Sequence, residues 1–126
     1  MTLRVLYVDD EPDIREIVAL SLSLDPGLAA ETVSSGAKAL ERAAAGGLDL
    51  ILLDVMMPDM DGPSILARLR ADPATAAIPV AFVTARTQAH EVDHFRALGA
   101  VGVVAKPFDP MTLAKDVRAL HALAGV

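Results

Sequence analysis

The segment Leu50–Leu53 consists of four large aliphatic residues, and Asp54 follows it directly. Such a run is typical of a strand that is buried on both faces of a parallel sheet. A Met-Pro pair at 57–58 and an Asp-Gly pair at 61–62 then break the strand and turn the chain toward a helix. Because open α/β sheets place their ligand sites at the carboxyl ends of the strands, the pattern predicts a carboxylate held at such an edge.

A second acidic cluster has the same setting. The segment 3–8 predicts a strand, and Asp9 and Asp10 follow it directly. If the two strand ends are neighbours, three carboxylates share one pocket, where like charges raise each other's pKa unless a cation lies among them. Oxygen ligands with open positions suit Mg²⁺, with Mn²⁺ as the alternative. A single Asp after a strand is as readily a turn former or helix cap, but two such clusters favour a metal site.

The remaining strand ends add a hydroxyl and an ammonium group. The segments 78–83 and 100–105 predict the fourth and fifth strands, which lead into Thr84 and Lys106. A hydroxyl donor and a cation opposite a metal-bound carboxylate are what the oxygens of a phosphoryl group need. The four strand ends therefore predict a site for phosphoryl chemistry.

Helix signals alternate with the strands. Pro12, Ser35, Pro63, Gln88 and Asp109 stand at the expected starts of five helices, and the segment 28–33 supplies the second strand. Alternating strand and helix units predict an α/β fold with a doubly wound, five-stranded parallel sheet and five helices. Residues 1–126 are expected to form a single domain, since this length suits one hydrophobic core.

Five motifs in order resemble the receiver domain of two-component response regulators. They are Asp9-Asp10, Asp54 with Met57-Pro58, Asp61-Gly62, Thr84 and Lys106-Pro107. The separations from the acceptor to the Thr (84 − 54 = 30) and to the Lys (106 − 54 = 52) are similar to those of the chemotaxis response regulator, and the resemblance covers essentially the whole chain. It implies a flavodoxin-like fold with strand order 2-1-3-4-5.

The resemblance implies a role for each carboxylate. Asp54 would accept a phosphoryl group from a sensor histidine kinase or a histidine phosphotransfer domain. Asp9 and Asp10, with the Asp54 carboxylate and the backbone carbonyl of Met56, would hold Mg²⁺. Lys106 would pair with Asp54 and then with the phosphoryl group. Such a chain is a signalling domain that catalyses only its own phosphorylation and dephosphorylation.

The resemblance also implies a switch. Thr84 would bind a phosphoryl oxygen, move with it, and alter the face of the fourth helix, fifth strand and fifth helix for a downstream protein partner. The Lys106-Pro107 bond is often cis in this family, as the small cis cost of X-Pro bonds permits. Many receivers carry an aromatic residue three positions before the Lys, where this chain has Val103. Output is therefore expected to depend mainly on Thr84.

Two further positions bear on the lifetime of the phosphorylated state. In receivers, the side chains two beyond the phosphoacceptor and two beyond the Thr flank the path of the attacking water. Here they are Met56 and Arg86. A bulky thioether obstructs water and a cation can cover the phosphate, so we expect a long-lived phosphorylated state.

Two enzyme classes are alternative interpretations. A phosphatase of the haloacid dehalogenase type also uses a strand-end Asp nucleophile with Mg²⁺, but it needs an acid two residues on, where this chain has Met56. His90-Glu91-x-x-His94 matches the H-E-x-x-H zinc-peptidase motif. No suitable third ligand follows, and these three side chains are expected to face solvent.

Composition agrees with a cytoplasmic signalling domain. The chain has no cysteine, so disulfide and thiolate chemistry are excluded. Its apolar runs are far shorter than a membrane span, and Leu3 already begins the first strand, so we expect neither a membrane anchor nor a signal peptide. A formal net charge of −6 disfavours nucleic-acid binding by this domain, because phosphate contacts need a basic surface.

Overall fold

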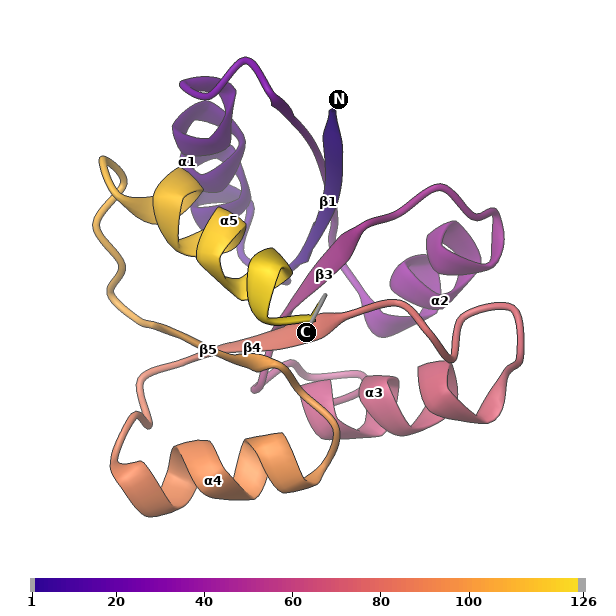
Figure 1. Cartoon of the computed structure of the whole chain (residues 1–126). Coiled ribbons are helices and arrows are strands. Elements are labelled where there is room, and N and C mark those ends of the chain that lie inside the picture. Colours follow the sequence, from indigo (N-terminus) through magenta and orange to yellow (C-terminus); the bar gives the residue numbers. More distant parts are fainter. Residues whose placement is uncertain (1, 125–126) are drawn as a thin grey trace.

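The computed structural model describes residues 2–124 (Figure 1). The strands are β1 (Leu3–Val8), β2 (Leu28–Val33), β3 (Leu50–Asp54), β4 (Val80–Thr84) and β5 (Gly102–Ala105). The helices are α1 (Pro12–Ser23), α2 (Gly36–Ala44), α3 (Gly62–Ala71), α4 (Ala89–Ala97) and α5 (Leu113–Ala124). Strands and helices alternate throughout, as the sequence predicts.

The five strands form one parallel sheet in the order β2-β1-β3-β4-β5. This confirms the flavodoxin-like order. The central pair β1 and β3 aligns Val8 with Leu53, so Asp9 and Asp54 occupy equivalent positions at the ends of neighbouring strands. Strand β4 pairs with β3 on its other side and aligns Val83 with Asp54. The register therefore brings the polar strand ends to one edge of the sheet.

Helices cover both faces of the sheet, with α1 and α5 on one face and α2, α3 and α4 on the other (Figure 1). All five residues of β3 and all five of β4 are buried. Alternate residues of β3 enter the two cores: Leu50 and Leu52 face α1 and α5, while Ile51 and Leu53 face the other helices. Burial on both faces explains why the apolar run before Asp54 is continuous rather than alternating.

Two strands begin later than the sequence pattern predicts. Strand β4 starts at Val80, because the backbone N–H of Ile78 donates to the carbonyl of Thr75 in a turn. Strand β5 starts at Gly102, because the N–H of Ala100 donates to the carbonyl of Phe95 and so still belongs to the end of α4. In both cases, at Ile78 and Ala100, the apolar side chain packs in the core while the backbone N–H is hydrogen-bonded within a turn and not in the sheet.

Helix starts show where capping chemistry acts. Ser35 caps α2 as expected, since its Oγ accepts the N–H of Lys38 at 3.2 Å. Asp61, expected only to form a turn with Gly62, caps α3 by accepting the N–H of Ser64 at 2.8 Å. Helix α5 begins at Leu113. It follows a turn in which the N–H of Leu113 donates to the carbonyl of Asp109.

Gly62 is fixed by close packing rather than by the turn alone. A Cβ at this position would lie 2.8 Å from the carbonyl oxygen of Asp54 and 3.0 Å from the ring of Phe82. Only glycine lets the start of α3 lie directly against the end of β3. None of the helices in residues 2–124 combines the length and apolar character that crossing a bilayer requires.

Candidate functional site

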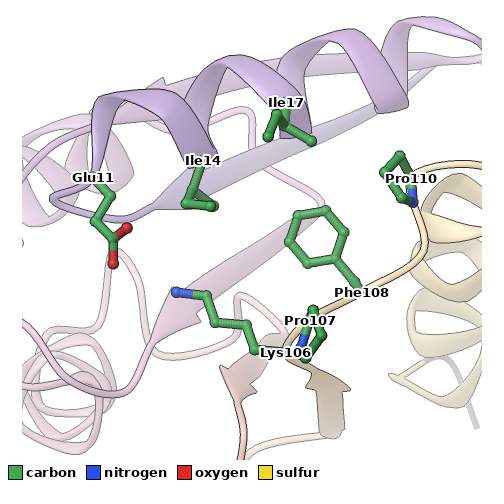
Figure 2. Close-up of a pocket in the computed structure, with 7 residues that line it drawn as sticks. All are labelled: Glu11, Ile14, Ile17, Lys106, Pro107, Phe108 and Pro110. Carbon is green, nitrogen blue, oxygen red and sulfur yellow. The ribbon is translucent and has the colours of Figure 1, made fainter.

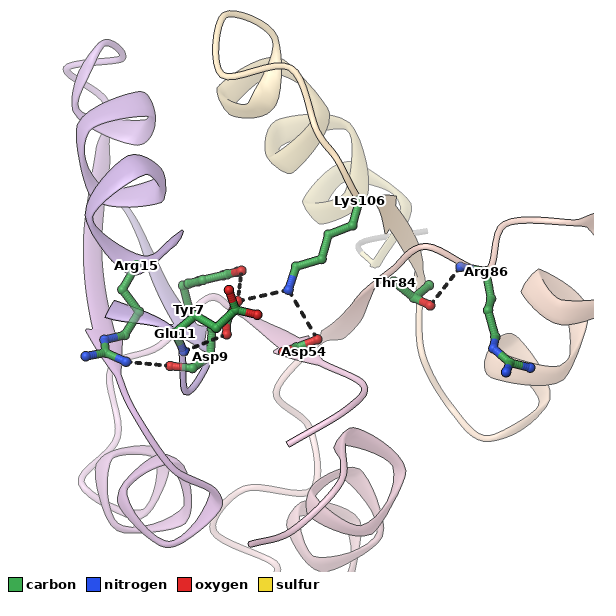
Figure 3. Close-up of polar contacts among 8 residues, drawn as sticks. All are labelled: Tyr7, Asp9, Glu11, Arg15, Asp54, Thr84, Arg86 and Lys106. Carbon is green, nitrogen blue, oxygen red and sulfur yellow. Dashed lines mark hydrogen bonds and ion pairs between the residues drawn. The ribbon is translucent and has the colours of Figure 1, made fainter. Parts of the chain in front are cut away.

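Four strand ends meet in one acidic pocket (Figure 3). Asp9 follows β1, Asp54 and Thr84 end β3 and β4, and Lys106 follows β5. Asp9 has no exposed surface, and Asp54 and Thr84 are each only 6% exposed. The structure thus brings together the acid, hydroxyl and ammonium groups that the sequence pattern placed at separate strand ends.

Asp9 is the most firmly held carboxylate of the site (Figure 3). Its Oδ2 accepts the Tyr7 hydroxyl at 2.6 Å and Lys106 Nζ at 3.1 Å, while its Oδ1 accepts the N–H of Glu11 at 3.0 Å. Burial raises the pKa of Asp9, but these three donors outweigh burial and leave the pKa below its usual value. Asp9 is therefore ionised and oriented by its own surroundings.

Lys106 lies between two carboxylates. Its Nζ is 3.1 Å from Asp9 Oδ2 and 3.5 Å from Asp54 Oδ1. Burial lowers the pKa of Lys106, but hydrogen bonding and attraction to the two acids raise it above its usual value. The Lys106-Pro107 peptide bond is cis, as the resemblance implied. Lys106 therefore stays charged and partly balances the two acids.

The pKa of Asp54 is shifted in the opposite direction to that of Asp9. Burial raises the pKa of Asp54 to about 6, and the negative charge of Asp9 contributes further. Lys106 and a hydrogen bond with the backbone of Met56 lower this pKa without restoring its usual value. The ionised carboxylate of Asp54 thus has too few positive or hydrogen-bonding partners to offset its burial, and a further cation would stabilise it.

The acidic residues fit a hard divalent cation. Asp9, Asp10 and Asp54 can each offer one carboxylate oxygen, and these oxygens lie within 4.8 Å of one another. Asp10 is more exposed than the other two, which leaves the cluster open on one side. An all-oxygen donor set with open positions matches the preference of Mg²⁺. Within residues 2–124, no other three Asp, Glu or His side chains come this close together.

The H-E-x-x-H motif lies on α4. His90 and His94 are exposed, as expected, but Glu91 is half-buried and not solvated. Its Oε2 lies 3.8 Å from Arg86 Nη1, so the carboxylate is engaged with a neighbouring cation. No acidic third ligand joins the pair among the residues described. The geometry therefore gives no support to the zinc-peptidase interpretation.

A cavity of about 240 Å³ opens beside Asp54 and is also lined by Met56, Thr84, Arg86 and Lys106. Thr84 Oγ1 accepts the N–H of Arg86 at 3.0 Å, so its own proton remains available for another acceptor. The Arg86 guanidinium points away from Asp54 (Figure 3). The Met56 side chain is 78% exposed at the mouth of the cavity. The space has the chemistry and position for an incoming anionic group.

Tyr7 and Arg15 both hold Asp9, although neither belongs to a sequence motif of the site. Besides the Tyr7 contact, Arg15 Nη1 donates to the backbone carbonyl of Asp9 at 2.8 Å. A period-2 signal could have found Tyr7, because residues two apart on a strand lie on the same face. The Arg15 contact depends on how α1 packs beside β1, which no local pattern reports.

Removing the Asp54 charge should stabilise the metal-free protein at high pH. We expect Asp54→Asn to raise the free energy of unfolding at pH 8 by on the order of 1–3 kcal/mol, because the ionised carboxylate is buried beside Asp9. Asp54 has its pKa raised from 3.8 to about 6, so the folded protein takes up a proton below pH 6 more readily than the unfolded chain. Protonation of Asp54 removes the cost of burying its charge as the pH falls from about 6 toward 4. The difference in the free energy of unfolding between Asp54→Asn and wild type should therefore become smaller over this range.

Urea denaturation of both proteins at pH 8 and pH 5, in chelator, measures this effect. Asp93→Asn, at an exposed acid of α4, is the matched control and should change stability little at either pH. A stability difference that does not vary with pH would contradict the raised pKa of Asp54.

Comparisons with known proteins agree with this geometry. The sequence profile of the response regulator receiver domain matches residues 5–118. The DNA-binding dual master transcriptional regulator RpaA of Synechocystis sp. is 37% identical over 117 residues, which cover 93% of this chain and 48% of that protein. The transcriptional activator protein IrlR of Burkholderia pseudomallei is 38% identical over 118 residues, covering 94% of this chain and 50% of IrlR. The chain thus spans about half the length of these curated relatives.

A solved structure matches along almost its whole length. The chemotaxis response regulator CheY4 of Vibrio cholerae superposes with a TM-score of 0.86 at 33% sequence identity, covering 95% of this chain and 99% of that chain. The strand order, the polar strand ends and the matched profile all agree. This chain therefore belongs to the family of response regulator receiver domains of two-component signalling systems.

Proposed function

We propose that Asp54 is the phosphoacceptor of this receiver domain and that its donor is a phosphohistidine of a sensor histidine kinase or phosphotransfer domain. The observation that carries the proposal is a buried Asp54 beside two further acids and Lys106. A carboxylate oxygen of Asp54 attacks phosphorus in line, the N–P bond of the donor breaks, and its electron pair stays on the imidazole nitrogen. The product is an aspartyl phosphate.

The neighbouring side chains would stabilise the transferred group. Lys106 Nζ already lies 3.5 Å from Asp54 and would neutralise charge on the phosphoryl oxygens. The Thr84 hydroxyl lines the same cavity and has a proton free to donate. Asp9, Asp10 and Asp54, with the backbone carbonyl of Met56, would hold Mg²⁺ or Mn²⁺. When bound, this cation supplies charge neutralisation and orients the phosphoryl oxygens.

An apolar groove supports a protein as the phosphodonor (Figure 2). The groove has a volume of about 400 Å³ and lies between α1 and the connection from β5 to α5. Ile14 and Ile17 of α1 face Phe108 and Pro110 across it, and Lys106 reaches its inner end. A partner helix seated there would bring a histidine toward the acidic pocket. A small-molecule donor would need no such surface.

Output would pass through Thr84 to the face formed by α4, β5 and α5. Thr84 is the last residue of β4, directly before the connection to α4, so its movement toward a phosphoryl group would pull on that connection. Val103 on β5 is half-buried and packs against the core beneath α4. A downstream protein that prefers one arrangement of this face would read the phosphorylation state, by its difference in affinity for the two states.

The proposal also covers the domain organisation, the location and the partner class of this chain. Residues 1–126 act as one receiver domain, and membership of this family supports a cytoplasmic location. The acidic net charge of −6 supports a protein partner rather than nucleic acid for this domain. DNA binding is named for RpaA, of which this chain matches 48%. Intact mass after exposure to a phosphodonor, with and without Asp54, tests the central assignment.

The side chain at position 56 should set the lifetime of the aspartyl phosphate. Met56 stands at the mouth of the cavity and offers attacking water no strong hydrogen bond. We expect Met56→Asn to speed hydrolysis, by roughly 10-fold or more, because a positioned polar group assists an attacking water. The proposed metal ligand at this position is the backbone carbonyl, so the metal site should be unchanged.

Decay of the phosphoprotein at fixed Mg²⁺ measures this. Met111→Asn is the matched control, since Met111 is 79% exposed, against 78% for Met56, and lies outside the cavity. Arg86→Ala is compared in parallel, since the Arg86 side chain is 75% exposed and its guanidinium pairs with Glu91. Equal decay in wild type, Met56→Asn and Arg86→Ala would show that neither side chain controls water.

A further inference from the structure

Tyr7 is a buried side chain that the phosphorylation mechanism does not use. Its ring packs in the core on the α1 and α5 side of the sheet, and it is 1% exposed. Its hydroxyl donates to Asp9 Oδ2 at 2.6 Å, the same oxygen that Lys106 Nζ contacts at 3.1 Å. The end of β1 makes this contact, because Asp9 directly follows the strand and lies two residues beyond Tyr7, so both side chains point to the same side of the sheet (Figure 3).

Under the proposed function, phosphorylation would affect the two donors to Asp9 Oδ2, Lys106 and Tyr7, differently. Lys106 also lies 3.5 Å from Asp54, and it is expected to turn to the phosphoryl group once that group is present. Tyr7 cannot leave, because its ring is locked in the core. After Lys106 withdraws, the fully buried Asp9 carboxylate keeps Tyr7 on Oδ2 and the N–H of Glu11 on Oδ1.

We propose that Tyr7 is a positioning residue that holds Asp9 in the orientation needed to bind the divalent cation. This inference rests on the proposed function, in which Asp9 is a ligand of Mg²⁺. Hydrogen-bond partners behind a metal ligand orient it, and their loss typically weakens metal affinity 10- to 100-fold. Without the hydroxyl, the N–H of Glu11 would still hold Oδ1, but Oδ2 would keep only Lys106, which also lies beside Asp54, so the cation would have to organise a less firmly held carboxylate.

The test is the Mg²⁺ dissociation constant of Tyr7→Phe, measured on the full chain by calorimetric titration with MgCl₂. Phenylalanine keeps the ring and removes only the hydroxyl, so the core remains filled. We expect affinity to fall about 10-fold. Thr75→Val is the matched control. It removes another buried hydroxyl, which donates to the carbonyl of Leu69 at 2.7 Å, and it should lower stability while leaving Mg²⁺ affinity unchanged.

A spectroscopic readout separates positioning from simple stabilisation. Tyr7 is the only tyrosine of the chain, which has no tryptophan. A phenol that is hydrogen-bonded to a carboxylate emits weakly, so drawing the charge of Asp9 onto a cation should raise tyrosine emission. We expect the emission of wild type and Thr75→Val to rise with Mg²⁺ at the same midpoint as calorimetry. Asp10→Asn should shift that midpoint to higher Mg²⁺.

The outcomes are distinguishable. Equal Mg²⁺ affinity in wild type and Tyr7→Phe would overturn the positioning role while leaving the metal site intact. Equal weakening in Tyr7→Phe and Thr75→Val would overturn it also, because any lost buried hydroxyl would then have the same effect. Absence of Mg²⁺ binding in wild type would overturn the proposed metal site, and this inference with it.

Discussion

Asp54→Asn is expected to abolish phosphorylation of this protein by a small-molecule phosphodonor such as acetyl phosphate. The amide has no nucleophilic carboxylate oxygen to offer, although it keeps the size of the side chain in the pocket. Wild type should gain a single phosphate in an intact-mass spectrum, and Asp54→Asn should gain none. Asp59→Asn, at an exposed acid of the next loop, should be phosphorylated like wild type.

The same reaction should require a divalent cation. Chelation should slow phosphate incorporation at least about 100-fold. This magnitude is typical of removing one group that stabilises the charge developing in the transition state. Mg²⁺ or Mn²⁺ should restore the rate, and Asp10→Asn should need more of either, because it weakens the three-carboxylate cluster. Phosphate that appears on Asp54→Asn, or at full rate in chelator, would overturn the assignment of the acceptor and its metal.

Thr84→Ala should separate phosphorylation from its structural response. The variant keeps Asp54 and the acidic cluster, so it should still be phosphorylated. It loses a hydroxyl facing the cavity beside Asp54, and one hydrogen bond to a charged group contributes about 1.5–3 kcal/mol. That free energy corresponds to roughly a 10- to 150-fold change in the ratio of the two states.

Amide hydrogen exchange along α4 and β5, with and without beryllium fluoride as an acyl-phosphate mimic, measures the response. Wild type and Thr84→Ser should change their exchange on addition of the mimic, and Thr84→Ala should change its exchange much less. Val103→Ala should cost roughly 0.5–3 kcal/mol of stability by lost packing and keep the response. Full response in Thr84→Ala, or its loss in Val103→Ala alone, would place the switch at β5 instead.

The fold could be predicted because its signals are local. The aliphatic run Leu50–Leu53 has no polar face, so it required cover on both sides, and the helices on the two faces of the sheet provide that cover. The polar residues at the strand ends predicted a shared edge, since parallel strands all end on the same side. Element limits were less accurate near Ile78 and Ala100, where apolar packing continues beyond the hydrogen bonds of the strand.

The sequence by itself determined which chemical groups stand at the sheet edge: three carboxylates, a hydroxyl and an ammonium group. Only the tertiary structure decided how these groups differ. Lys106 and Asp9 are 97 residues apart in the chain and 3.1 Å apart in space. That proximity leaves Asp9 ionised with three donors, while Asp54, buried with fewer, has its pKa raised to about 6. Residue type fixes what a carboxylate can do, but burial and neighbouring charge fix its protonation, and both arise only when distant strands pack together.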